Sequence, residues 1–178
     1  MLIKAVFSGF GGQGVLMMGY VLAVAGMRDG KNVTYLPAYG AEVRGGTANC
    51  TVAIADEEIA SPVASSPEFV VVMNKPSLSR FQNVIQSGGG LFINSSMVDT
   101  RPVRGDIEIF EVPANDLAKD LGNGRLTNMI MLGAFVRKTG MASLGTTEQA
   151  VQEIFEEKGK SIVKQNKRAL KAGYDYMG

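Results

Sequence analysis

Short apolar segments alternate with longer helical patterns along the first half of the chain. The short segments are apolar or β-branched, as in strands, and they occupy residues 2–7, 32–36, 47–54, 69–73, 91–93 and 107–112. Apolar residues at helical spacing predict helices over residues 13–28, 76–86, 115–121, 126–138, 146–157 and 160–172. Residues 69–73 form one continuous apolar run, which is typical of a central strand covered on both faces.

Strands that alternate with helices predict an α/β fold. We expect a single domain, residues 1–178, built as a three-layer α/β/α sandwich around a mainly parallel, mixed central sheet. The first strand, helix and second strand should form a right-handed βαβ unit with parallel pairing. A Thr-Thr-Glu-Gln sequence at residues 146–149 predicts a capping box at the start of its helix.

Glycine is concentrated where the first strand meets the first helix. Gly9, Gly11 and Gly14 match the G-x-G-x-x-G pattern, and Gly12 adds a fourth glycine. Without a Cβ the backbone can approach a ligand closely, and the N–H groups at a helix N-terminus favour an anion. We therefore expect an anionic cofactor group to be bound by Gly9, Gly11, Gly12, Gln13 and Gly14. Two other interpretations stay open, namely close helix-to-strand packing and a subunit contact.

A dinucleotide site would need one more element. It uses an acidic residue about 20 positions later, at the end of the second strand, to hold the ribose hydroxyls. Here the second strand runs into Pro37 and Ala38 instead. Because this acidic residue is missing, a free-standing dinucleotide-binding protein is the second functional hypothesis and not the first.

Ligands of open α/β sheets bind at the carboxyl ends of the strands. This rule places Asn74, Lys75 and Asn94 on the same edge as the glycine loop, and we expect them to help bind the cofactor. The glycine-bounded loop after the second strand should also lie there, at a cleft or interface shared with another subunit. Its candidate residues are Tyr39, Gly40, Glu42, Arg44, Gly45 and Gly46.

Arg44 is the better functional candidate within this loop. Its guanidinium can hold a carboxylate or a phosphate through two parallel hydrogen bonds. Glu42 would project to the same side of an extended segment, where it could orient Arg44 or pair with another subunit. A solvated or purely inter-subunit ion pair is the alternative.

Composition excludes several classes of function. The formal net charge of +1 lacks the basic excess of a nucleic-acid-binding protein. One cysteine, Cys50, and no histidine leave no disulfide framework, no metal site and no cluster ligands, and the sequence assigns no catalytic residue. The apolar run at residues 15–27 is too short to span a membrane. We therefore expect a cytoplasmic protein with neither nucleic acid nor membrane as partner.

Several of these segments together resemble a known family, the gamma subunit or catalytic-domain module of 2-oxoacid:ferredoxin oxidoreductases. The resemblance covers most of the chain up to about Lys138. It is carried, in order, by Gly-Phe-Gly-Gly-Gln-Gly at residues 9–14, Tyr-Gly-Ala-Glu-Val-Arg-Gly-Gly at 39–46, the turn at 56–62, Asn-Lys-Pro-Ser at 74–77 and Asn-Met-Ile-Met-Leu-Gly-Ala at 128–134.

The resemblance implies membership of an assembly that decarboxylates a 2-oxoacid on thiamine diphosphate, passes electrons through iron–sulfur clusters to ferredoxin and releases an acyl-CoA. Thiamine diphosphate, magnesium and the clusters would lie on sister alpha, beta and ferredoxin-like subunits, and this chain would hold no cofactor tightly. The loop at 39–46 is more similar to the 2-oxoglutarate and branched-chain types than to the pyruvate type. Whether coenzyme A contacts this chain, or whether the chain is a structural subunit without a ligand, stays open.

Overall fold

A mixed β-sheet forms the centre of the fold. The computed structural model of the chain describes residues 1–40 and 46–178. In the described part, six strands lie in the order β2-β3-β1-β4-β5-β6. They are β1 (Leu2–Phe10), β2 (Asn32–Tyr39), β3 (Thr47–Ala55), β4 (Phe69–Val72), β5 (Gly90–Asn94) and β6 (Glu108–Val112). The helices are α1 (Val15–Arg28), α2 (Lys75–Phe81), α3 (Ala114–Asp120), α4 (Thr127–Thr139), α5 (Leu144–Phe155) and α6 (Lys160–Tyr176), with short 3-10 turns η1 (Gly124–Leu126) and η2 (Glu156–Lys158).

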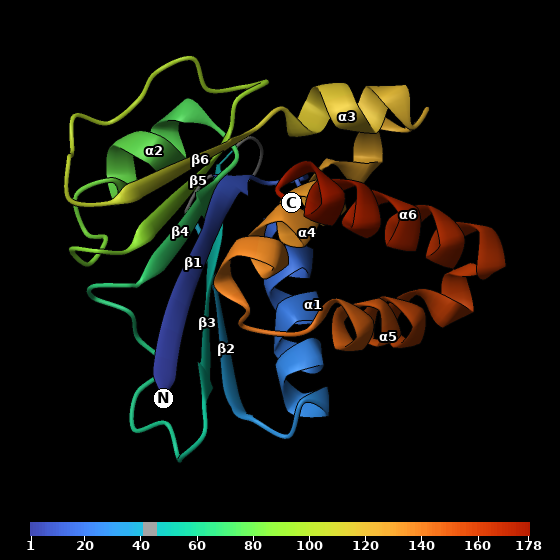
Figure 1. Cartoon of the computed structure of the whole chain (residues 1–178), viewed down its shortest axis with the longest axis horizontal. Coiled ribbons are helices and arrows are strands. Elements are labelled where there is room, and N and C mark those ends of the chain that lie inside the picture. Colours follow the sequence, from blue (N-terminus) through green and yellow to red (C-terminus); the bar gives the residue numbers. More distant parts are fainter. Residues whose placement is uncertain (41–45) are drawn as a thin grey trace.

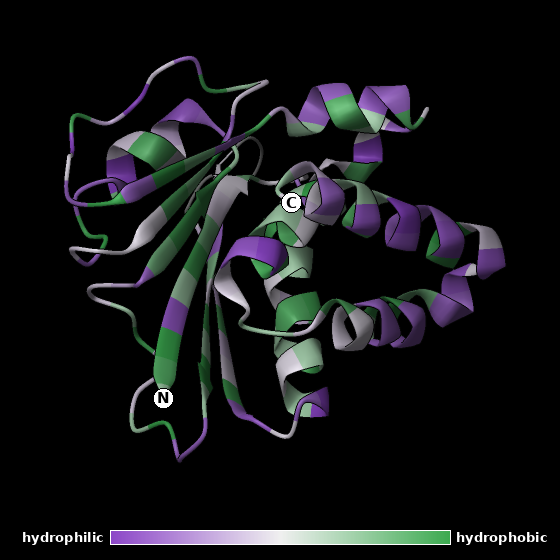
Figure 2. Cartoon of the chain, viewed as in Figure 1, coloured by the Kyte–Doolittle hydropathy of each residue, from purple (hydrophilic) through white to green (hydrophobic). Residues whose placement is uncertain are grey.

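Helices cover both faces of the sheet, but unequally (Figure 1). On one face α1 and α4 pack against the strands, and α5 and α6 pack against those two helices. On the other face lies α2. Side chains of successive strand residues point to opposite faces of the sheet and so pack into two hydrophobic cores. Phe7 and Phe92 lie in the larger core, and Val70 and Leu91 lie in the smaller one. Polar residues concentrate on the outer helices α5 and α6, as Figure 2 shows. The predicted three-layer α/β sandwich is confirmed.

The predicted parallel pairing of the first two strands is wrong. β3 lies between them and runs antiparallel to both, from Leu2 opposite Ala55 to Phe10 opposite Thr47 on the β1 side. β3 is mostly buried, whereas β2 is largely exposed and contains Pro37, which cannot donate to a sheet hydrogen bond. These properties place β2 at the edge and β3 inside. β1 pairs in parallel with β4 on its other side, so residues 69–72 are central as predicted.

Helix α4 is buried along most of its length, from Thr127 to Val136. The ring of Phe135 lies between three aromatic rings of the sheet. Its centroid is 5.1 Å from those of Phe7 and Phe92, and 5.9 Å from that of Phe69. Edge-to-face and tilted contacts of this kind add to the free energy gained by burying apolar area. They fix α4 against β1, β4 and β5.

Glycines let α4 and α6 approach each other at backbone contact. A Cβ on Gly133 of α4 would collide with the carbonyl oxygen of Leu170, and a Cβ on Gly173 of α6 with that of Ile130. Both glycines have ordinary helical conformations, so the requirement is space and not backbone freedom. The close packing of α4 against α6 therefore requires glycine at both positions.

Two further expectations from the sequence concern the start of α5 and Cys50. The cap of α5 is Ser143, whose Oγ accepts a hydrogen bond from Thr146 N at 3.0 Å, so the predicted capping box at residues 146–149 is wrong. Cys50 is a core residue as expected, and burial raises the pKa of its thiol to about 12.

None of the helices in the two described ranges has both the length and the apolar character that crossing a bilayer requires.

Replacing Gly173 with Ala should destabilise the protein by ~1–3 kcal/mol or more, because the added methyl forces α6 away from α4. The measurement is urea denaturation followed by circular dichroism. Gly145→Ala is the control, since a Cβ there has its nearest heavy atom 3.8 Å away. That control should be neutral or stabilising by up to ~1 kcal/mol through helix propensity. Wild-type stability of Gly173→Ala would contradict the close contact.

Candidate functional site

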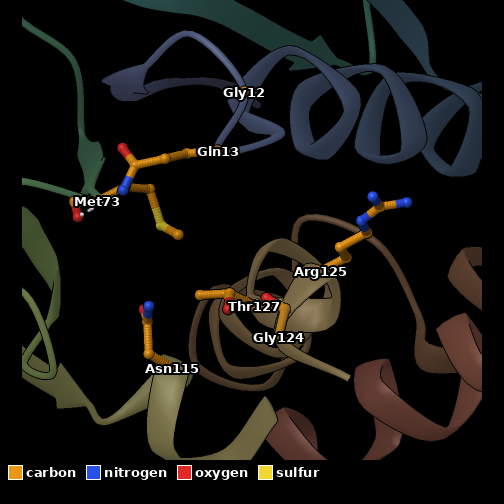
Figure 3. A pocket seen from close by; sticks show the side chains of 7 residues that line it. All are labelled: Gly12, Gln13, Met73, Asn115, Gly124, Arg125 and Thr127. Carbon is orange, nitrogen blue, oxygen red and sulfur yellow. Dashed lines mark hydrogen bonds between the residues drawn. The ribbon is translucent and has the colours of Figure 1, made fainter. Parts of the chain in front are cut away.

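A polar hollow of about 150 Å³ opens at the carboxyl edge of the parallel strands (Figure 3). It brings together the loop between β1 and α1, the end of β4 and the starts of α3, η1 and α4. Its lining residues are Gly12, Gln13, Met73, Asn115, Gly124, Arg125 and Thr127. In Figure 3, Gln13 and Met73 lie across the hollow from Asn115 and Thr127, and Arg125 stands at its side.

The glycine loop, residues 9–14, contributes Gly12 and Gln13 to the lining of this hollow, while Gly14 lines a neighbouring hollow. Gly12 and Gly14 have φ values of 93° and 75°, a left-handed conformation that favours glycine. Gly11 N donates to Gly46 O at 3.0 Å, and Gln13 N to Phe10 O at 3.1 Å. Within the described residues, the N–H groups of Gly12 and Gly14 donate to no other backbone or side-chain group. They are therefore available to a ligand.

Asn115 adds a side-chain donor on the far side of the hollow. Its Oδ1 accepts a hydrogen bond of 2.7 Å from Asn94 Nδ2, so its own Nδ2 is left to face the hollow. Asn94 is fully buried, and its Oδ1 has no partner within the described part of the chain. Asn94, expected to bind the cofactor, thus does not line the hollow. It contacts Asn115, which does.

Helix α4 begins at the hollow and also contacts the glycine loop. Asn128 Nδ2 donates to Gly14 O at 3.3 Å, and a Cβ on Gly14 would collide with the Asn128 amide. The N-termini of α1 and α4 both lie here, so the positive ends of two helix dipoles meet. Arg125 adds a full positive charge, and among the described residues no carboxylate belongs to the lining. The hollow therefore favours an anion.

The remaining predicted residues lie around this hollow. Lys75 does not line it, and its Nζ is 3.5 Å from Asp99 in an exposed ion pair. Asn74 caps α2 through Oδ1, which accepts from Ser77 N at 2.9 Å. Tyr39 is exposed and lines a second, mainly apolar hollow beside the glycine loop, and Gly40 N donates to Thr47 O at 2.7 Å. Glu42, Arg44 and Gly45 lie outside the described residues.

Sequence reasoning missed five residues that line the hollow, namely Met73, Asn115, Gly124, Arg125 and Thr127. The available signal was position, because Asn115 and Thr127 stand at or next to the starts of predicted helices, where the chain returns to the carboxyl edge of the sheet. In the described ranges there is no group of three or more His, Cys, Asp and Glu side chains that could hold a metal ion.

Comparison with known proteins identifies the family. The model of the pyruvate ferredoxin/flavodoxin oxidoreductase family matches residues 4–176. The ketoisovalerate oxidoreductase subunit VorA of Methanothermobacter marburgensis is 36% identical over 98% of this chain and 36% of its own length. The 2-oxoglutarate synthase subunit KorC of the same organism is 34% identical, and the match covers 82% of each chain.

A solved structure supports the same fold. The 2-oxoglutarate:ferredoxin oxidoreductase of Magnetococcus marinus, with 2-oxoglutarate, coenzyme A and succinyl-CoA bound, superposes with a TM-score of 0.91 at 22% identity, over 99% of this chain and 31% of that one. The chain thus spans about a third of the length of some of its relatives and most of the length of others. The match over nearly all residues confirms the resemblance seen in the sequence: this chain belongs to the pyruvate ferredoxin/flavodoxin oxidoreductase family.

Proposed function

We propose that this chain is the gamma-type module of a 2-oxoacid:ferredoxin oxidoreductase, which oxidatively decarboxylates a 2-oxoacid to an acyl-CoA with ferredoxin as electron acceptor. Membership of the family supports this proposal. Two relatives are named for ketoisovalerate and 2-oxoglutarate, which supports a branched-chain 2-oxoacid or 2-oxoglutarate as substrate over pyruvate.

The part that we assign to this chain is to hold a phosphate group of coenzyme A at the polar hollow. The observation that carries this assignment is the lining itself: in the part of the chain that the structure describes, it offers Arg125, the Asn115 amide and the N–H group of Gly12 as donors, and it contains no carboxylate. Charge-assisted hydrogen bonds from a guanidinium are the strongest that a protein offers to a phosphate. A structural neighbour with coenzyme A bound supports the choice of ligand.

The redox chemistry belongs, in this proposal, to the sister alpha, beta and ferredoxin-like subunits. Thiamine diphosphate with magnesium would supply the decarboxylation there, and iron–sulfur clusters the path of the electrons. The single cysteine of this chain is buried with a raised pKa, which suits neither a cluster nor a thiolate. This chain's residues instead bind and orient coenzyme A, so that its thiol is held near the reacting carbon and need not be captured from solution.

The topology argues against a free-standing dinucleotide-binding protein. In such proteins the second strand lies beside the first, where its acidic residue reaches the ribose of the dinucleotide. Here β3 separates β2 from β1, and the described end of β2, up to Tyr39, carries no carboxylate. Glu42 follows outside the described residues.

Purification from the native source tests the assembly. We expect a brown multi-subunit particle that reduces ferredoxin with a 2-oxoacid and coenzyme A, because the clusters of the sister subunits absorb visible light. Rates with ketoisovalerate, 2-oxoglutarate and pyruvate, measured side by side, identify the substrate. A colourless protein that retains NAD would overturn the proposal and favour the alternative.

Replacing Arg125 with Ala should weaken coenzyme A binding about tenfold or more, since a hydrogen bond to a charged group contributes ~1.5–3 kcal/mol. Arg125→Lys should fall between Ala and wild type, because it keeps the charge but loses the planar fork. Isothermal titration calorimetry on the full chain gives the affinity, and the KM for coenzyme A in the assembled enzyme checks it. Arg168→Ala, at an exposed position on α6, is the control. Equal affinity of Arg125→Ala and Arg168→Ala would refute the role of Arg125.

A further inference from the structure

The side chain of Gln13 folds back onto its own loop. Its Oε1 accepts hydrogen bonds from Phe10 N at 2.6 Å and from Asn74 Nδ2 at 3.2 Å. Its Nε2 donates to Met73 O at 3.3 Å, the dashed line in Figure 3. One amide thus links the end of β1, the end of β4 and the first residue before α2.

The surrounding residues make room for this conformation. A Cβ on Gly9 would lie 2.6 Å from Gln13 Oε1, so the amide can occupy its position only beside a glycine. Asn74 is fixed in turn, because its Oδ1 accepts from Ser77 N at 2.9 Å while it caps α2. The amide of Gln13 is therefore bound to groups that cannot easily shift.

These bonds leave little of Gln13 for a ligand. Both acceptor positions of Oε1 and one of the two Nε2 hydrogens are engaged within the protein. An amide oxygen aimed at a phosphate would also repel it. The neighbouring backbone N–H groups of Gly12 and Gly14, in contrast, have no partner within the described part of the chain.

We propose that Gln13 is a positioning residue, which holds the glycine loop in the conformation that presents the N–H groups of Gly12 and Gly14, and that it acts on coenzyme A through them. This inference rests on the proposed function, since it concerns the same site. Gly12 and Gly14 have left-handed φ values, but glycine residues in an unrestrained loop adopt many other backbone conformations as well. Tethering the loop at β4 removes that freedom before the ligand arrives, so less conformational entropy is lost on binding.

The test compares Gln13→Met with Gln152→Met. Methionine has a similar length but makes none of the three hydrogen bonds. Gln152 is an exposed residue of α5 that accepts a hydrogen bond from Lys167 Nζ at 3.0 Å, away from the loop, and serves as the matched control. Hydrogen exchange of residues 10–16 is measured in the full chain without ligand. The Kd for coenzyme A follows by calorimetry, and kcat and KM are measured in the assembled enzyme.

We expect exchange at residues 10–16 to become about tenfold faster or more in Gln13→Met, because the opened loop is more populated. The Kd and KM for coenzyme A should rise about tenfold, with kcat at saturating coenzyme A within about twofold of wild type. Gln152→Met should change none of these. A merely structural role would lower the melting temperature or the amount of active enzyme and leave KM alone.

Three results would overturn the inference. Unchanged exchange with a raised Kd would show that Gln13 contacts the ligand directly. Faster exchange with an unchanged Kd would show that the loop conformation does not matter for binding. Unchanged exchange and Kd together would show that the three hydrogen bonds fix nothing. If the wild-type chain and the wild-type assembly both fail to bind coenzyme A, the proposed function fails first, and the exchange experiment still reports on the loop.

Discussion

The placement of helix α4 is the constraint on which the site depends. Phe135 fits among three aromatic rings of the sheet, and glycines on α4 and α6 bring the two helix backbones into contact. Because α4 is held from both sides, its first turn has one position, beside the glycine loop. Asn128 then contacts Gly14, and Thr127 and Arg125 line the hollow. Packing farther along α4, at Gly133 and Phe135, thus sets the distance between the two walls of the site, as expected for close-packed interiors.

The opposite wall is set by hydrogen bonds and not by apolar packing. The glycines of the loop supply backbone freedom, which would by itself give a mobile segment, and the amide of Gln13 restricts it. Asn94 has a similar relation to Asn115, since it is buried and orients a side chain that lines the hollow. Together these contacts arrange donors around a small space at the ends of two helix dipoles. Such an arrangement favours a phosphate without any metal ion.

Much of the fold could be predicted from the sequence, because the period of apolar residues separates strands from helices. The position of β3 could not be predicted, since the local pattern does not say which strands become neighbours. The exposure of β2, seen only in the structure, explains why β2 lies at the edge and β3 inside.

The glycine loop is visible in the sequence as a motif, whereas Arg125 and Asn115 come to lie near it only through the packing of α3, η1 and α4. The sequence predicts cofactor contacts for Gln13 and Asn94, because it shows a polar side chain but not the hydrogen-bond partner that this side chain has in the fold. Arg44 stays a prediction, outside the described residues.

We propose that the glycine loop and the hollow beside it receive a phosphate of coenzyme A. A titration of the 15N-labelled chain with coenzyme A, followed by two-dimensional NMR, tests it most directly, because each backbone N–H gives its own signal. We expect the amide signals of Gly12 and Gly14 and the side-chain signals of Asn115 and Arg125 to move most, and to move less with a coenzyme A analogue that lacks the phosphates. Shifts confined to other surfaces, such as the outer face of α5 and α6, or no shifts at saturating ligand, would contradict it.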